Sequence, residues 1–122
     1  MKIDGHCHCG QITFEAEVDP NAVLICHCTD CQTLTGSAYR AVISAPAAHF
    51  VLRTGLPKSY VKTAESGNKR RHAFCGNCGT PIYACAVDKS AELFPAHRYY
   101  HSACSLFTAA ANLAALCPTL GR

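Results

Sequence analysis

The spacing of the cysteines is the feature that most constrains how this chain folds. Ten of the 122 residues are Cys, and most of them fall into three short motifs: Cys7-x-Cys9, Cys26-x-Cys28-x-x-Cys31 and Cys75-x-x-Cys78. Cysteines one or two residues apart rarely form a disulfide with each other, but their thiolates converge easily on one tetrahedral ion. The spacing therefore predicts metal sites in a reduced, cytoplasmic chain. The N-terminus agrees, because it lacks the apolar stretch of a secretion signal.

Length and charge narrow the partners that the chain can serve. A chain this short forms one domain with a modest core, so metal cross-links would matter for its stability. The formal net charge of +3 fits an anionic small-molecule substrate and does not require nucleic acid or a membrane surface. Residues 103–117, the longest weakly apolar stretch, are too few and too polar to span a bilayer. Neither nucleic acid nor a membrane is therefore expected as a partner.

Residues 1 to 88 have the pattern of β structure interrupted by turns. Ile12, Phe14, Ala16 and Val18 alternate with polar residues, and Asp19-Pro20-Asn21 ends this strand. Further strand candidates follow at residues 22–25, 39–44, 49–53, 59–63, 69–74 and 81–85. Short strands at such regular intervals predict a mainly β domain. Only residues 29–35 have the pattern of a helical turn.

The two outer motifs have the form of metal-binding knuckles. Gly10 follows Cys9, and Gly79 follows Cys78; glycine tolerates the positive φ that such tight turns need. Two knuckles would supply four thiolates to one closed tetrahedral site, which is structural because it leaves no position for a substrate. Two free dithiols, or a redox-active C-x-x-C, are the alternatives. The βαβ context of a thioredoxin motif is absent.

The middle motif differs because it has three thiolates and no distant fourth partner of equal quality. Cys26, Cys28 and Cys31 lie within six residues. Three protein ligands and an open position are typical of a catalytic zinc, which would lower the pKa of an incoming thiol and make it a nucleophile. The alternative is that Cys85, His27 or another side chain closes the site and makes it structural. Cys85 on its own has the pattern of a small buried hydrophobe.

The histidine and basic residues near these motifs give weaker signals. His8 and His27 alternate with the cysteines, so each is expected to point away from its ion. His72 lies in a basic strand and is expected at the surface or lining a site. Lys69-Arg70-Arg71 is either a solvated face or a carboxylate clamp for an acidic peptide.

Taken in order, these motifs resemble the family of glutathione-dependent formaldehyde-activating enzymes and centromere protein V. The resemblance covers residues 1 to about 88. It rests on Gly5-His6-Cys7-His8-Cys9-Gly10, Cys26-His27-Cys28-Thr29-Asp30-Cys31, Gly36-Ser37, Arg53-Thr54-Gly55 and Phe74-Cys75-Gly76-Asn77-Cys78-Gly79-Thr80-Pro81-Ile82-Tyr83.

The resemblance implies a fold of several small antiparallel sheets of the zinc-binding β-tent type, with two Zn²⁺ sites. It implies a structural zinc on the outer motifs and a catalytic zinc on the middle motif: Cys7, Cys9, Cys75 and Cys78 for the first, and Cys26, Cys28 and Cys31 for the second. The implied activity is that of a carbon–sulfur lyase acting on a glutathione–aldehyde adduct, with formation of S-(hydroxymethyl)glutathione from glutathione and formaldehyde. Arg40 or Arg71 would hold the carboxylates of glutathione. The alternative is a two-zinc binding module without turnover that serves a protein partner.

Residues 89–122 depart from the family pattern and are expected to form an atypical tail after a domain of residues 1–88. The Ala- and Leu-rich residues 103–116 predict a short helix, and the Trp-containing ending of the family is missing because the chain has no Trp. A divergent helical tail, a truncation and a shifted reading frame are the competing explanations. Codons permitted for residues 111–121, read from their second base, can spell Gln-Ile-Trp-Arg-Arg-Ser-Ala-Leu-Pro-Trp-Val, which favours the shift. Such a tail would leave a sheet edge and apolar surface uncovered.

Overall fold

The computed structural model describes residues 1–64, 66–87 and 104–107, which form two antiparallel sheets. The strand order is β1-β2-β5 in the three-stranded sheet and β3-β4-β9-β8-β7-β6 in the six-stranded sheet. The strands are β1 (Lys2–His6), β2 (Thr13–Glu17), β3 (Val23–Cys26), β4 (Arg40–Ala45), β5 (Phe50–Thr54), β6 (Lys58–Thr63), β7 (Lys69–Phe74), β8 (Pro81–Ala86) and β9 (Cys104–Phe107). The helix α1 (Thr29–Thr35) follows β3, and 3-10 turns at Pro20–Ala22 and Ala47–His49 precede β3 and β5.

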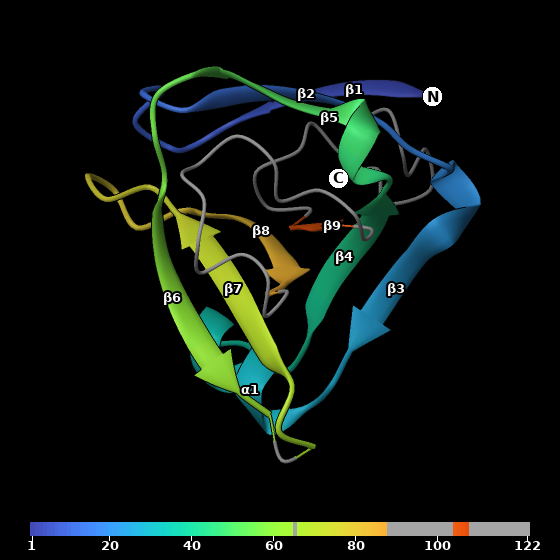
Figure 1. Cartoon of the computed structure of the whole chain (residues 1–122), viewed down its shortest axis with the longest axis vertical. Coiled ribbons are helices and arrows are strands. Elements are labelled where there is room, and N and C mark those ends of the chain that lie inside the picture. Colours follow the sequence, from blue (N-terminus) through green and yellow to red (C-terminus); the bar gives the residue numbers. More distant parts are fainter. Residues whose placement is uncertain (65, 88–103, 108–122) are drawn as a thin grey trace.

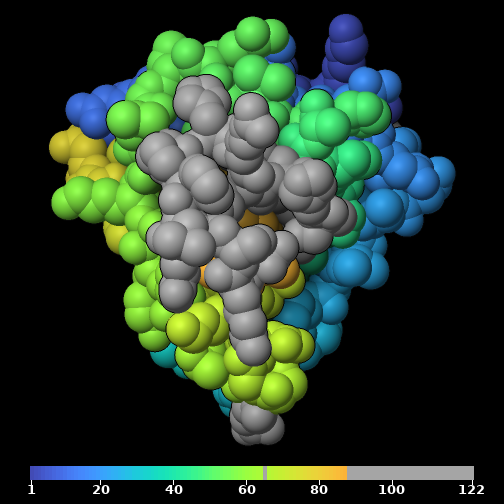
Figure 2. All heavy atoms as spheres, viewed as in Figure 1, coloured from blue at the N-terminus to red at the C-terminus, as the bar shows by residue number. Residues whose placement is uncertain are grey.

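The sheets together have the outline of a tent. The three-stranded sheet lies across one end, and the pairs β3–β4 and β6–β7 run away from it as two arms that approach each other where α1 lies (Figure 1). In the space-filling view from the same side, the two arms lie on opposite sides of the molecule (Figure 2). The predicted mainly β class is therefore confirmed. No helix in the described part of the chain is long and apolar enough to cross a membrane.

The predicted strands and the observed strands differ mainly at their ends. Every strand predicted between residues 12 and 85 corresponds to an observed strand, and the predicted helical turn is α1. Before residue 88, the strand that the sequence pattern did not reveal is β1. Its inward positions are Ile3 and Gly5, and a glycine at an inward position adds no apolar side chain to the pattern.

The core lies between the two sheets and is joined by aromatic rings. Phe14 of β2 packs against Phe50 of β5 with 5.5 Å between ring centroids, and Phe50 contacts Tyr83 of β8 at 5.1 Å. Cys7 and Cys75 are buried in the same cluster. Both outer cysteine motifs therefore begin inside the core, whereas α1 buries none of its residues.

Strand β9 corrects two expectations about the end of the chain. The predicted helix over 103–116 is wrong at Cys104–Phe107, where the backbone pairs with β4 on one side and with β8 on the other. Helix propensity differs by less than about 1 kcal/mol per residue, so pairing with two strand edges outweighs it. The same pairing fills the edges that the tail was expected to leave uncovered. The rest of the predicted helix and tail lies outside the described residues, and the frame shift stays a prediction.

Gly55 fixes the turn after β5 against the chain that follows the first cysteine motif. Its φ is +74°, and a Cβ at this position would lie 2.5 Å from the carbonyl oxygen of Gln11 and 2.9 Å from Cγ1 of Ile12. Distances this short are not tolerated by a side chain. The close approach therefore requires glycine, and it supports the turn that carries Cys7 and Cys9.

We expect Gly55→Ala to lower the free energy of unfolding by about 2–4 kcal/mol, because a non-glycine residue pays about 1–3 kcal/mol for a strained backbone region and the clash adds to it. Gly67→Ala is the matched control. Gly67 has a similar φ of +84°, but nothing lies within 4 Å of its Cβ position, so only the conformational cost remains. Denaturant unfolding at saturating metal measures both variants. Equal losses would contradict a role for the close approach.

Candidate metal centres

Two clusters of thiols could each hold a metal ion. The outer cluster consists of Cys7, Cys9, Cys75 and Cys78, and the middle cluster consists of Cys26, Cys28 and Cys31. Within each cluster the Sγ atoms all lie within 4.8 Å of one another, and every one of these cysteines is a free thiol. The structure thus brings together both sets of residues that the sequence singled out.

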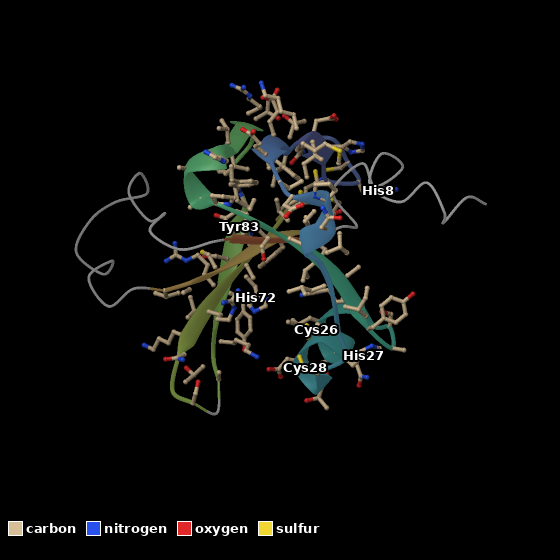
Figure 3. The ribbon with its side chains drawn as sticks, turned by 90° about the vertical axis from the view of Figure 1, so that its right-hand side faces the viewer. His8, Cys26, His27, Cys28, His72 and Tyr83 are labelled. Carbon is tan, nitrogen blue, oxygen red and sulfur yellow. The ribbon has the colours of Figure 1, made fainter. Side chains whose placement is uncertain are left out.

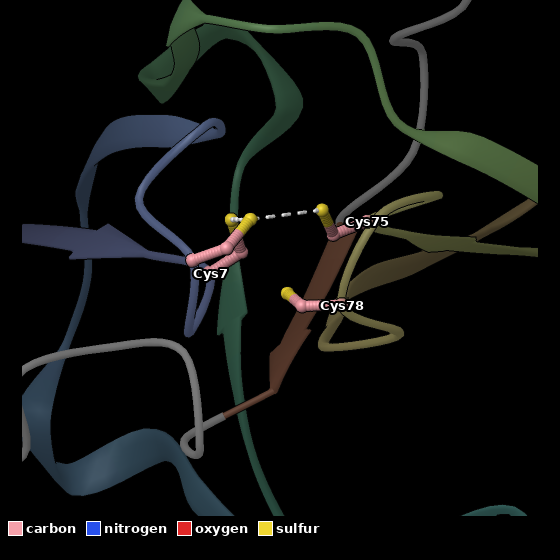
Figure 4. Close-up of side chains that lie close together, drawn as sticks. Cys7, Cys75 and Cys78 are labelled. Carbon is pink, nitrogen blue, oxygen red and sulfur yellow. Dashed lines mark hydrogen bonds between the residues drawn. The ribbon is translucent and has the colours of Figure 1, made fainter.

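The outer cluster is built by two glycine-containing turns. In the turn between β1 and β2 the Gly10 N–H donates to the Cys7 carbonyl at 2.9 Å, and in the turn between β7 and β8 the Gly79 N–H donates to the Cys75 carbonyl at 2.8 Å. Both glycines have positive φ, +78° and +76°. The turns direct Cys7 from one side toward Cys75 and Cys78 on the other (Figure 4).

The sulfur–sulfur distances test whether this donor set fits a metal. Cys7 Sγ lies 3.5 Å from Cys9 Sγ, which lies 3.7 Å from Cys75 Sγ. A disulfide would require about 2.05 Å. Four sulfurs at about 2.3 Å from one tetrahedral zinc lie about 3.8 Å from each other. The outer cluster therefore has the dimensions of a closed four-thiolate site.

Thr80 joins the two turns, and the sequence analysis did not single it out. Its Oγ1 accepts the His8 N–H at 3.0 Å and lies 3.2 Å from Cys78 Sγ, to which it can donate its proton. Hydrogen bonding from Thr80 lowers the pKa of Cys78 to about 5, and the side chain of Asn77 lowers the pKa of Cys9. Both effects favour the thiolate, which is the form that binds metal. In the sequence, the signal for this role was a hydroxyl residue directly after the second turn.

The middle cluster is formed where β3 meets α1. Cys26 ends β3, Cys28 is the N-cap of α1, and Cys31 lies in the first helical turn. Cys28 Sγ accepts the Cys31 N–H at 3.4 Å and lies 3.4 Å from Cys26 Sγ. The N–H of Cys31 lowers the pKa of Cys28, whereas burial, together with Cys26 and Cys28, raises the pKa of Cys31 to about 12. Three thiolates this close repel one another, so the cluster suits a cation.

Neither of the two named candidates closes the middle cluster. Among the described residues the cluster contains the three thiols, and neither His27 nor Cys85 belongs to it. The His27 ring instead packs against Tyr39 with centroids 5.9 Å apart, and it points away from Cys26 and Cys28 in Figure 3. Cys85 is buried in the core, as expected.

A cavity of about 240 Å³ connects the middle cluster with the opposite arm. The thiols and α1 form one side of it, and Lys62, Arg70 and His72 of β6 and β7 form the other. Arg40, which is only 5 % exposed, pairs with Cys26 across β3 and β4 and also lines the cavity. An ion pair between Lys62 and Asp30 of α1 links the two arms.

The charges around this cavity favour an anion. In the described part of the chain, three cations line it, Arg40, Lys62 and Arg70, together with a single carboxylate, that of Asp30. The three thiols of the middle cluster line it as well, and a bound cation would offset their negative charge. Burial lowers the pKa of His72, and Arg40, Lys62 and Arg70 lower it further, so His72 is a neutral imidazole at pH 7. Burial also lowers the pKa of Arg40, and the thiols of the middle cluster oppose this effect. Arg71, a neighbour of Arg70 in sequence, does not line the cavity.

A larger hollow of about 440 Å³ lies over the three-stranded sheet, but it is not a comparable site. Its lining includes Lys2, Glu17 and His49 and contains no cysteine of either cluster. Because size alone carries no chemistry, we place the candidate site at the middle cluster.

Comparisons with known proteins bear on the family and the fold of this chain. A family model described as glutathione-dependent formaldehyde-activating enzyme matches residues 2–97. No curated protein sequence matches the chain. Among solved structures, a protein from Rhodobacter sphaeroides aligns with a TM-score of 0.62 and 18 % identity, covering 88 % of this chain and 85 % of that protein. At this identity the likeness shows the fold alone.

Proposed function

This chain belongs to the glutathione-dependent formaldehyde-activating enzyme family, and on that premise we propose that it is a zinc-dependent carbon–sulfur lyase-type enzyme that interconverts glutathione, an aldehyde and their adduct. The observation that carries the proposal is the middle cluster facing a cavity with excess positive charge. In this proposal Cys26, Cys28 and Cys31 hold a catalytic zinc, and the outer cluster holds a structural zinc. Glutathione has one thiol and two carboxylates, so its chemistry matches such a cavity.

The residues of the cavity have separate tasks in the proposed reaction. A zinc ion at the middle cluster would lower the pKa of the substrate thiol, so that sulfur is available as a nucleophile at neutral pH. Arg40 and Arg70 attract the carboxylates of glutathione and orient its sulfur. As the sulfur–carbon bond forms, the electron pair of the carbonyl moves to oxygen. That oxygen takes up one proton, the same number that the thiol loses, and neutral His72 is positioned to carry it.

The proposal also places the chain in the cytoplasm. Both clusters bind metal only as reduced thiolates, and the thiol substrate must stay reduced as well. A reducing compartment meets both requirements.

Catalysis can be measured directly. We expect the zinc-loaded chain to raise the rate of adduct formation from glutathione and formaldehyde by at least about tenfold over the uncatalysed reaction at the same pH, followed by NMR exchange spectroscopy. Bound zinc without any acceleration would instead favour the non-catalytic binding module.

A pair of variants at neighbouring arginines tests the role of the cavity in this reaction. Arg70→Ala should raise the KM for glutathione about tenfold, because a charge-assisted contact with a carboxylate is lost. Arg71→Ala removes the same charge from the adjacent residue, which does not line the cavity, and should leave KM nearly unchanged. Equal effects of the two variants would mean that only the overall charge matters.

A further inference from the structure

The face that β6 and β7 turn toward the cavity changes its chemistry along its length. Directly opposed residues of an antiparallel pair lie on the same face. The register opposes Lys62 with Arg70 and Tyr60 with His72. It then opposes Phe74 with Lys58, whose side chain lies against Gly76. A cationic pair is therefore followed by an aromatic and imidazole pair, and then by an apolar ring.

A second cavity of about 220 Å³ adjoins the first at the apolar end of this face. The two cavities share Leu34, Arg40 and His72. Tyr60, Phe74 and Pro81 line the second cavity alone, and no carboxylate, lysine or cysteine contributes to its lining among the described residues. We call this second cavity the apolar chamber. His72 lies at its junction with the first cavity, on the side that faces Cys26 and Cys28 in Figure 3.

The apolar chamber does not match either of the small substrates named so far. Among the residues that the structure describes, Arg40, at the junction with the first cavity, is the one cation of the chamber's lining. Beyond it, among Tyr60, Phe74 and Pro81, the carboxylates of glutathione would lose their hydration without gaining a matching partner. Formaldehyde has a single carbon and needs no chamber. From Arg70 to Phe74 the strand covers about 13 Å, so one adduct can place its charged part at the cationic end and a different group in the chamber.

We propose that the aldehyde substrate of this chain carries an apolar, ring-sized substituent, which binds in the chamber among Tyr60, Phe74 and Pro81 while the carboxylates of the thiol substrate are held at the cationic end. This inference rests on the proposed function and specifies its substrate class. The step remains an addition: the sulfur–carbon bond forms, the carbonyl π pair moves to oxygen, and that oxygen takes the proton that the thiol releases. No oxidant or reductant is consumed. Burial of the apolar group adds binding energy next to the reacting carbonyl.

Two thioethers probe the chamber without any turnover. We expect the zinc-loaded chain to bind S-benzylglutathione at least about tenfold more tightly than S-methylglutathione, because the benzyl ring removes more apolar surface from water. Tyr60→Ser should abolish most of that preference. Val61→Ser is the matched control, since Val61 is the next residue of β6, faces the other side, and is similarly exposed at 42 % against 56 % for Tyr60. Isothermal titration calorimetry measures all three proteins.

Turnover gives the second readout. With benzaldehyde as substrate, Tyr60→Ser should lower kcat/KM about tenfold, whereas with formaldehyde the change should stay within about twofold. Equal binding of the two thioethers by the wild-type chain overturns the inference, as does an equal loss for both aldehydes in Tyr60→Ser. Preferential binding of S-benzylglutathione without turnover of either aldehyde would support the chamber and refute the lyase. Turnover of formaldehyde with equal thioether binding would support the lyase and overturn the chamber.

Discussion

Cys78→Ser should leave the chain without a stable fold. The outer cluster joins the turn between β1 and β2 to the turn between β7 and β8, and two of its cysteines are part of the core. Structural zinc sites contribute about 10–16 kcal/mol of apparent binding free energy, whereas whole domains are stable by only about 5–15 kcal/mol. Loss of one thiolate of four therefore removes more stability than this small core can replace. Circular dichroism and a zinc count on the purified variant measure the outcome.

Thr80→Val is the control for this experiment because it keeps every thiolate and the side-chain shape. It removes the hydroxyl beside Cys78 Sγ, so the pKa of Cys78 should rise from about 5 toward its ordinary value. Protons then compete with the metal at higher pH, and the midpoint of acid-induced zinc release should shift upward. Zinc affinity at pH 7 should fall about tenfold, as for other groups that support metal ligands. A Cys78→Ser chain that stays folded and keeps both metals would contradict the assignment of the outer cluster.

Local features of the sequence predicted most of the fold, and the failures are non-local. Alternation of apolar residues located β2, which buries one face. Short apolar or β-favouring runs between turn residues located β3 through β8, although β3 and β6 bury none of their residues. Strand β1 escaped because Gly5 faces inward. Strand β9 escaped because its pairing with β4 and β8 joins segments far apart in sequence, while its own surroundings favour helix by composition.

The thiol clusters could be predicted because ligand spacing is local, but the cavity could not. The sequence named Arg40 and Arg71 as equal candidates for a carboxylate contact. The structure places Arg40 in the cavity lining and Arg71 outside it, since successive residues of β7 face opposite sides and Arg70 and His72 occupy the inner one. Which arginine of β7 lines the cavity depends on which face of the strand turns toward α1. Thr80 likewise gained its role only when two distant turns met.

Cys31→Ser should separate catalysis from folding. Cys31 lies in α1, which buries none of its residues, and it is outside the core cluster. We therefore expect the free energy of unfolding to change by less than about 1 kcal/mol. The middle cluster would keep two thiolates, too few to retain zinc in competition with a chelator. The zinc content should fall from two ions per chain to one, and thiol–aldehyde activity should fall to the uncatalysed rate.

Cys85→Ser is the complementary variant, which should lose stability but keep both metals. Cys85 is a buried cysteine of the core that does not belong to either cluster, so a hydroxyl there should cost about 1–3 kcal/mol of stability and leave both metals and the activity in place.

Zinc content, denaturant unfolding and the rate of adduct formation are measured on both variants. If Cys85→Ser also loses one zinc, Cys85 is a fourth ligand and the middle site is closed to substrate. If Cys31→Ser keeps two zinc ions and full activity, the nucleophilic sulfur is not activated at this cluster. Loss of one zinc and of activity in Cys31→Ser alone is the result that an open, catalytic middle site requires.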